Sequence, residues 1–441
     1  MLRPRDLDRG AARERGGDPG GYADREGRSP LANLASATGS QERAVRALVR
    51  RGACLLGLLV GCAGETRPAP QLAAPITVDA RPAAVVIDAA VPVDAAPPAP
   101  APHLELTFAG DIQFGGVFRG RFRAANTAAL DPFAAMRDAL ASDLALANLE
   151  TTVQATIPVD ESGDKRFAAT PDQLALVATS GLDVVTLANN HAWDYGAAAV
   201  RETQRYVAAA GLRAVGVAYD DEPAWRVETV EVRGWRVGII AGTTKTNRGV
   251  AAGDPRLPIA EPGELVDVVT PLVQAARVDH DLVIVTVHWG TQYAEAPDAW
   301  QVTAAHAFVD AGADLVIGHH PHVLQGFERY QGGLIAYSLG NFVFRNAQLP
   351  ARHTGVLRVG FARQPAGRAC LDGAALQPAI MIKEPTHHPM PATGSELAAL
   401  AKRVTRISAA RPLRTAVTLD GGVLRLPAAC AAIVGADVPA R

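Results

Sequence analysis

Three of the eleven histidines in this 441-residue chain stand within four positions, as His319, His320 and His322. They follow residues 314–317, a mostly apolar run that predicts a buried strand. Imidazole is the commonest metal-binding side chain, and α/β proteins place ligands at the carboxyl ends of strands. His320 and His322 have the His-x-His spacing that lets two rings converge on one metal cluster. His319 could replace either, and we expect one of the three to contact a ligand instead of the metal.

Two carboxylates also follow apolar runs. Asp111 ends the run that starts at Leu104, directly after a glycine that lets the backbone turn. Asp is a hard oxygen ligand suited to divalent metals, although a lone Gly-Asp pair is more often a plain turn. Glu150 follows the run 144–147 and could bind or bridge metal ions. Taken alone, Glu150 is better explained as a solvated strand end. The interpretation of both carboxylates as metal ligands therefore depends on the nearby histidine motifs.

A dense polar motif over residues 186–196 stands at the exit of a further strand. Asn189 and Asn190 offer amide oxygens, and His191 offers an acid–base group. Asp194 either shapes the loop or contacts substrate. Coincidence is the lesser alternative for so many polar groups at one strand end.

Two more polar residues follow apolar strands nearer the carboxyl terminus. His288 ends the run 282–287, and Gly290 lets the chain turn behind it. A histidine in such a place is often a satisfied core residue, but the other motifs favour a metal ligand. Asn341 follows the run 334–337 and either lines the same site or forms a tight turn.

These motifs require a scaffold whose strands end at a common edge. Apolar runs alternate with amphipathic stretches from Leu104 onward, which is typical of α/β structure. Asp131-Pro132 and Thr170-Pro171 each place a capping residue before a first-turn proline, which predicts two helix starts. We expect strands over 104–109, 144–147, 184–187, 237–241, 282–287, 315–317, 334–337 and 356–361. We expect helices over 132–141, 171–179, 197–210, 264–276, 299–311 and 395–408.

The amino-terminal region is typical of an envelope targeting signal. A basic region precedes a short apolar run and Cys62, the order found in bacterial lipoprotein signals. We expect a signal over 43–62 with lipid on Cys62; a signal without lipid and a buried helix are the alternatives. Residues 1–42 are either a disordered extension or follow a wrongly assigned start. Residues 63–102, rich in Ala and Pro, predict an extended tether. The resemblance to Gram-negative lipoproteins implies that Ala63, directly after the lipid cysteine, favours the outer membrane, facing the periplasm.

Composition and charge limit the kinds of partner that we expect for this chain. The net charge of −2 gives no electrostatic reason to expect nucleic acid. No stretch reaches the roughly 18 apolar residues of a spanning helix.

We expect residues 363–441 to form a C-terminal extension. Its Cys370 and Cys430 form either a disulfide, which an oxidising compartment would favour, or two unpaired buried thiols.

The motifs GD, NLE, ANNH-x-x-DYG, HWG, GHHPH and SLGNF, in this order, resemble the CapA family of poly-γ-glutamate capsule-synthesis proteins, the PGA_cap domain. That family is similar to calcineurin-like metallophosphoesterases. The resemblance implies one domain over 104–362, an α/β fold built as a four-layer α/β/β/α sandwich. It implies that His191 acts beside the substrate as an acid or an electrostatic partner and that Asp111 takes part in catalysis by holding metal. The metal shell that it implies consists of Asp111, Glu150, Asn190, His288, His320 and His322.

Two positions depart from the metallophosphoesterase pattern. Those enzymes usually carry Asp-x-His in the first motif, where this chain has Gln113 in place of the histidine. They usually carry Asp in the second motif, where this chain has Glu150. Because Gln113 removes an imidazole, we expect one metal ion to bind weakly or with another ligand, and phosphatase activity stays open. The residues expected to support the ligands or contact substrate are Gln113, Asn189, Asp194, His319 and Asn341.

The resemblance implies a metal-dependent hydrolase or transferase in capsule polymer synthesis or export. One or two divalent ions would lower the pKa of a bound water and clamp the scissile group. Mixed carboxylate, amide and imidazole ligands suit Mn, Fe or Zn better than Ca or Mg. The expected partners are an anionic envelope polymer or a capsule synthase complex, and the membrane through the lipid anchor. The alternative is a non-catalytic component that binds polymer or synthase; a structural metal site is weaker, because the ligands are spread widely along the chain.

Overall fold

The computed structural model describes residues 102–430 except 115–130, 158–165, 251–252, 346–348, 365–368, 383–386 and 429. The expected signal with Cys62, the segment 1–42 and the tether up to residue 101 lie outside the described residues. Within the described part of the chain, no helix is both long and apolar enough to cross a membrane.

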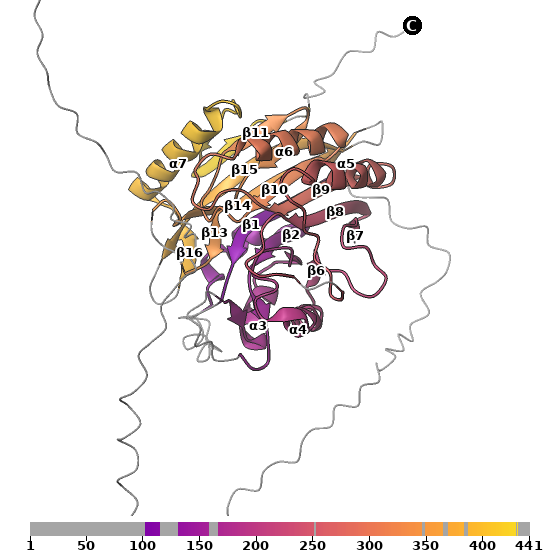
Figure 1. Ribbon diagram of the computed structural model, residues 1–441. Coiled ribbons are helices and arrows are strands. Elements are labelled where there is room, and N and C mark those ends of the chain that lie inside the picture. The colour runs from indigo at the N-terminus through magenta and orange to yellow at the C-terminus, as the bar shows by residue number, and fades with distance from the viewer. Residues whose placement is uncertain are drawn as a thin grey trace, which may run out of the picture. The chain divides into compact units, whose positions relative to one another are not determined.

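A ten-stranded mixed sheet carries the first half of the polar motifs (Figure 1). Its strands β1 (His103–Ile112), β2 (Leu144–Leu149) and β5 (Val184–Thr186) run parallel, so their carboxyl ends meet at one edge. The main path runs β17-β18-β15-β14-β1-β2-β5-β6, while β13 pairs with β1 and β16 with β15. The other strands are β6 (Arg213–Val215), β13 (Asn341–Val343), β14 (His353–Arg363), β15 (Ala369–Ile382), β16 (His388–Pro391), β17 (Thr418–Asp420) and β18 (Val423–Leu426).

A six-stranded sheet, in the order β11-β12-β10-β9-β8-β7, carries His288 and the histidine motif, while Asn341 lies on β13 of the larger sheet. Its inner strands β8, β9, β10 and β12 are parallel, and an antiparallel strand closes each edge. A separate pair, β3 (Thr152–Val153) and β4 (Ala168–Ala169), lies near the end of β2 in the sequence. The six strands are β7 (Glu228–Val232), β8 (Trp235–Thr243), β9 (Leu282–His288), β10 (Leu315–His319), β11 (Phe327–Tyr330) and β12 (Gly333–Ala336).

The core lies between the two sheets and under their outer helices. Leu106 and Phe108 of β1 share one buried cluster with Ile284 of β9 and Ile317 of β10. A second cluster joins the larger sheet to α3 (Pro171–Ala178) and α4 (Gly196–Ala209). A third joins the smaller sheet to α5 (Leu265–Ala276) and α6 (Ala299–Ala311). The α/β fold class expected from the sequence is confirmed, and every expected strand is present.

One of the two expected helix starts is correct and the other is not. Thr170 caps α3 in a reciprocal capping box with Gln173, and a proline follows at the first helical position. The helix expected over 132–141 is instead a turn, a 3-10 helix η3 (Ala134–Met136) and a short α2 (Arg137–Leu140). Asp131 accepts a hydrogen bond from the Phe133 amide two residues on, 2.9 Å away, which closes a local turn in place of a helical first turn.

The C-terminal segment continues the larger sheet. Strand β15 pairs with β14 from His353↔Ile380 to Arg363↔Ala369, and β18 pairs with β15 in turn. Helix α7 (Gly394–Ala409) covers the expected helix over 395–408. Cys370 and Cys430 are joined, with their Cα atoms 5.6 Å apart, so the structure takes the disulfide of the two alternatives.

Candidate metal centre

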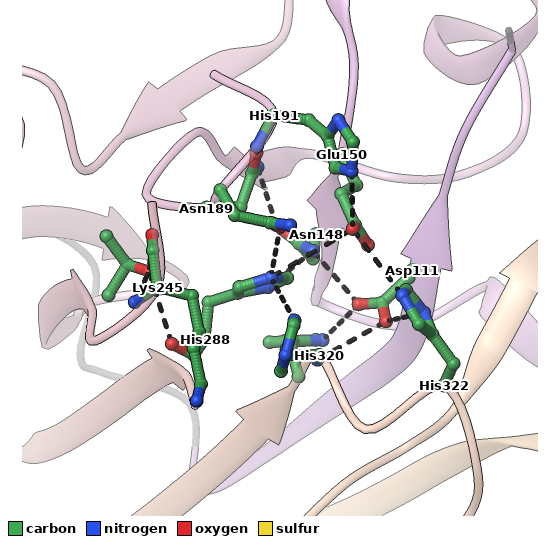
Figure 2. Close-up of polar contacts among 12 residues, drawn as sticks. Asp111, Asn148, Glu150, Asn189, His191, Lys245, His288, His320 and His322 are labelled. Carbon is green, nitrogen blue, oxygen red and sulfur yellow. Dashed lines mark hydrogen bonds and ion pairs between the residues drawn. The ribbon is translucent and has the colours of Figure 1, made fainter. Parts of the chain in front are cut away.

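The carboxyl ends of parallel strands from both sheets converge on one buried polar cluster (Figure 2). In the larger sheet, Asp111 of β1 is in register with Asn148 of β2, and Glu150 follows directly. In the smaller sheet, His319 at the end of β10 is in register with His288 at the end of β9. Strand register therefore brings residues far apart in the sequence to one point, as the sequence motifs predicted.

Asp111 is fully buried and surrounded by donors. Asn148 donates from Nδ2 to Oδ1 at 2.9 Å. The Nδ1 atoms of His319 and His322 lie 3.2 Å from Oδ1 and 3.3 Å from Oδ2. Burial alone would raise the pKa of Asp111, but hydrogen bonds with His319 and His322 hold that pKa well below its usual value. Asp111 is therefore a carboxylate, the form that binds metal.

Glu150 is fully buried without the donors that Asp111 has. Among the described residues, neither of its carboxylate oxygens has a hydrogen-bond partner. Three imidazole Nε2 atoms surround Oε1 at longer range: His191 and His322 at 3.8 Å, and His288 at 4.0 Å. Burial raises the pKa of Glu150 well above its usual value, and the negative charges of Asp111 and Asp194 raise it further. A carboxyl in this state ionises only where a positive charge such as a cation compensates it.

His288 connects the centre to the loop after β5. Its Nε2 atom lies 2.7 Å from Oδ1 of Asn190 and 3.1 Å from Nδ1 of His320. Burial lowers the pKa of His288 well below its usual value, and His320 lowers it further. Burial likewise lowers the pKa of His320 to about 3, with His322 adding to the effect. Both rings are therefore neutral and keep a nitrogen lone pair for a metal.

The donor set fits divalent metal. Asp111, Glu150 and His322 offer ligand atoms that all lie within 4.8 Å of one another. Glu150 is also close to His288, whose neighbours are Asn190 and His320. The six residues expected as ligands thus form two groups that share Glu150. Its two oxygens, which have no hydrogen-bond partner among the described residues and are enclosed by imidazoles, are what a cation would satisfy.

His191 stands beside this cluster and is held on two sides. Its Nδ1 atom lies 2.7 Å from Oδ2 of Asp194. The Phe167 ring stacks on the imidazole with centroids 3.9 Å apart, and the Phe167 amide donates to the same Asp194 oxygen at 2.7 Å. Asp194, expected either to shape the loop or to contact substrate, lies behind His191 and orients it.

The other supporting residues expected from the sequence take distinct places. His319 contacts Asp111, and Asn341 places Oδ1 3.0 Å from Nδ1 of His322. Asn189 donates to Oδ1 of Asn148 at 3.0 Å and accepts the His191 amide at 3.1 Å. Gln113 is buried, and its Oε1 atom has no hydrogen-bond partner among the described residues.

The sequence motifs missed two residues of this network. Asn148 donates to Asp111, and the same Nδ2 atom lies 3.2 Å from Nδ1 of His288, so this amide joins the two sheets. Its position inside a strand-end motif was the available signal. Asn247 accepts from Nδ2 of Asn190 at 2.9 Å, and its own Nδ2 atom lies 3.2 Å from Nε2 of His191. It belongs to the loop after β8, where no pattern indicated a functional residue.

A cavity of about 470 Å³ opens over the cluster. His191, His320 and His322 line it, so these residues are accessible from the cavity. Its walls bring together segments from both sheets: Phe167, Arg248, Tyr293 and Phe344. The cavity is large enough for a small group or a chain end to approach the metal cluster.

Comparison with known proteins finds one bacterial family. The family model described as "Bacterial capsule synthesis protein PGA_cap" matches residues 105–346, more than half of the 441 residues. The capsule biosynthesis protein CapA of Bacillus anthracis is 36% identical over 188 residues, which is 42% of this chain and 46% of that protein. The PGA biosynthesis protein CapA of Bacillus subtilis is 34% identical over 188 residues, 42% of this chain and 48% of that protein. The chain thus spans about half the length of these relatives.

A solved structure of a hypothetical protein from Thermus thermophilus is also similar, at 18% identity and a TM-score of 0.34. The similarity covers 65% of this chain and 96% of that one.

Proposed function

This chain belongs to the family of bacterial capsule synthesis proteins, and on that premise we propose that it is a metal-dependent hydrolase or transferase that acts on a capsule polymer such as poly-γ-glutamate. The observation that carries the proposal is Glu150. Its carboxylate is fully buried and unpartnered among the described residues, and three imidazoles surround it. Ionising such a group is costly unless a cation binds it, and two of these imidazoles, His191 and His322, line the cavity.

Two groups of residues would hold the metal. Asp111, Glu150 and His322 form one, and Glu150 with Asn190, His288 and His320 forms the other. This mixed oxygen and nitrogen donor set suits Mn, Fe or Zn. When bound, a divalent ion would supply Lewis-acid polarisation of the scissile group and a more acidic water.

His191 would serve as the proton donor or acceptor at the leaving group. Asp194 accepts at Nδ1, which fixes the ring orientation and leaves Nε2 as the atom that exchanges a proton. Phe167 covers one face of the ring. Nε2 also lies 3.8 Å from Glu150, so the proton-exchanging atom is adjacent to the metal cluster.

We place this activity in the cell envelope. The proposed partners are an anionic envelope polymer or a capsule synthase complex. The proposed attachment is lipid on Cys62, at the outer membrane and facing the periplasm; it rests on the sequence motif alone, because Cys62 lies outside the described residues.

Metal content tests the proposal directly. Elemental analysis of the purified chain is compared with the double variant Asp111→Ala/His320→Ala, which removes one ligand from each group. We expect one or two equivalents of Mn, Fe or Zn in the native chain and their loss in the variant. Absence of metal from the native chain after reconstitution would refute the catalytic proposal.

A second function is favoured by one departure in the site. Gln113 stands where related metallophosphoesterases carry a histidine, so the group around Asp111 is one imidazole short. If this departure leaves no metal with an open coordination position, the domain would instead be a non-catalytic component that binds polymer or a capsule synthase. Metal-loaded protein that binds γ-linked glutamate oligomers without cleaving them would support this alternative.

A further inference from the structure

One loop that lines the cavity is held to the rest of the domain at several points. We call residues 291–298 the Tyr293 loop; it connects β9 to α6. At its base, the Thr291 hydroxyl donates to Oδ2 of Asp298, the residue that caps α6, at 2.9 Å. Near its tip, the amide of Tyr293 donates to the carbonyl of Pro321 at 2.8 Å, within the histidine motif. The loop is therefore tied directly to the segment that carries His320 and His322.

Tyr293 has an unusual backbone and an exposed ring. Its φ angle of 62° lies in the left-handed region, which a bulky residue rarely adopts. Its side chain is 48% exposed, yet it lines the cavity and its ring centroid lies 6.0 Å from that of His322. A strained backbone that displays an aromatic ring beside the metal cluster indicates a binding role.

The middle of the loop is held by hydrogen bonds from Gln325 and by ion pairs with two arginines. Gln325, which is fully buried, donates from Nε2 to the carbonyls of Ala294 and Ala296 at 2.9 and 3.1 Å. Between them, Glu295 accepts from Nε of Arg403 at 2.9 Å and from Nη2 of Arg406 at 3.0 Å. The hydrogen bond from Arg403 lowers the pKa of Glu295, so the carboxylate is charged in this pair.

Both arginines belong to α7, which lies outside the stretch matched by the family model, residues 105–346. Arg403 is only 8% exposed, and its Nη2 donates to the carbonyl of Leu324 at 2.8 Å. Ser408 at the end of α7 accepts the Phe327 amide at 3.0 Å. Helix α7 is thus hydrogen-bonded to residues 324 and 327, which follow the histidine motif, as well as to the Tyr293 loop.

We propose that α7 positions a substrate-contacting aromatic: Arg403, acting through Glu295, holds the Tyr293 ring at the mouth of the cavity. Arg403 and Glu295 are positioning residues, and Tyr293 is the contact residue. The ring face offers apolar contact to a polymer chain that enters the cavity. The contact with substrate rests on the proposed function, whereas the fixing of the loop by α7 does not.

Hydrogen exchange of the full chain tests the fixing of the loop without any substrate. Glu295→Ala removes the ionic contact and leaves Tyr293 in place. We expect the amides of Tyr293 and Ala294 to exchange about tenfold faster, because local opening becomes easier. Asp420→Ala is the matched control, since it removes the partner of Arg425 in an exposed ion pair on the β17–β18 hairpin. Equal exchange of the loop in both variants would overturn the proposal.

A double-mutant cycle tests the contact. The probe is a γ-linked glutamate oligomer, titrated calorimetrically into the Mn²⁺-loaded chain. We expect Tyr293→Ala to weaken binding about tenfold, Glu295→Ala to weaken it to a similar extent, and the double variant to show no further loss. Tyr293→Ala with unchanged affinity, or fully additive losses, would contradict the positioning role. No binding by the native chain would count against the proposed polymer substrate, and hydrogen exchange would still decide whether α7 fixes the loop.

Discussion

His191 and Asp194 form a buried pair, with Nδ1 of the imidazole 2.7 Å from Oδ2 of the carboxylate. The same oxygen accepts the Phe167 amide at 2.7 Å, and the Phe167 ring lies on the imidazole. The pair is three residues apart in the sequence, so the turn after β5 builds it locally. It fixes which nitrogen of His191 faces the cavity.

Asp194→Asn is expected to lower turnover about hundredfold or more. The asparagine amide can donate to Nδ1, which favours the tautomer with its proton on Nε2 and the wrong acid–base state. Turnover of p-nitrophenyl phosphate and of a γ-linked glutamate oligomer would be measured alongside metal content. Metal content should stay unchanged, because Asp194 is not among the proposed ligands; loss of metal would instead make Asp194 part of the metal shell.

Glu150→Gln is expected to have opposite effects on stability without and with metal. In metal-free protein near neutral pH the change removes a carboxyl that burial disfavours from ionising, and it should raise the free energy of unfolding by about 1–3 kcal/mol. Metal at a hundredfold excess over its dissociation constant should stabilise the native chain by about 2.7 kcal/mol and the variant far less. Urea unfolding with chelator and with Mn²⁺ would measure both. A variant less stable than the native chain under chelator would contradict the account of Glu150.

Asn247 has two contacts that two variants separate. Asn247→Ala loses the acceptor for Asn190 and the donor towards His191, whereas Asn247→Asp keeps the acceptor alone. We expect about tenfold weaker metal binding in the alanine variant, because Asn190 loses the contact that orients it. Metal affinity should be retained in the aspartate variant, while turnover falls in both. Mn²⁺ titration calorimetry would test this, and equal metal affinities in the two variants would exclude the orienting role.

The sequence predicted the strands and the proposed ligands for the same physical reason. An apolar run that ends in a polar residue indicates a buried strand, and the polar residue then lies at the carboxyl end of that strand, where α/β proteins bind ligands. Asp111 and His288 are two examples. Asn247 could not be predicted, because its role depends on a loop crossing to Asn190 and His191 in the final fold. Residues 369–382 show no clear strand pattern in the sequence, because they mix glycine, proline and alanine. They form β15 because they pair with β14.

A substitution at Gly110 would test whether the close approach of the backbones at Gly110 and Gly340 sets the geometry of the metal centre. A side chain there would collide with the carbonyl oxygen of Gly340, which accepts the Asp111 amide at 2.9 Å. Gly110→Ala must therefore push β1 away from the turn before Asn341 and move Asp111 with it. We expect a loss of about 1–3 kcal/mol or more in the free energy of unfolding, together with weaker metal binding.

Gly373→Ala is the matched control for this change. It also adds a methyl group to a glycine in a strand of the larger sheet, but nothing lies within 4 Å of the added atom. Urea unfolding and metal analysis of both variants would make the comparison. If Gly110→Ala matched Gly373→Ala in stability and metal content, the contact between Gly110 and Gly340 would not set the position of Asp111. A loss confined to Gly110→Ala would show that the metal centre depends on this contact, since alanine itself is tolerated elsewhere in the same sheet.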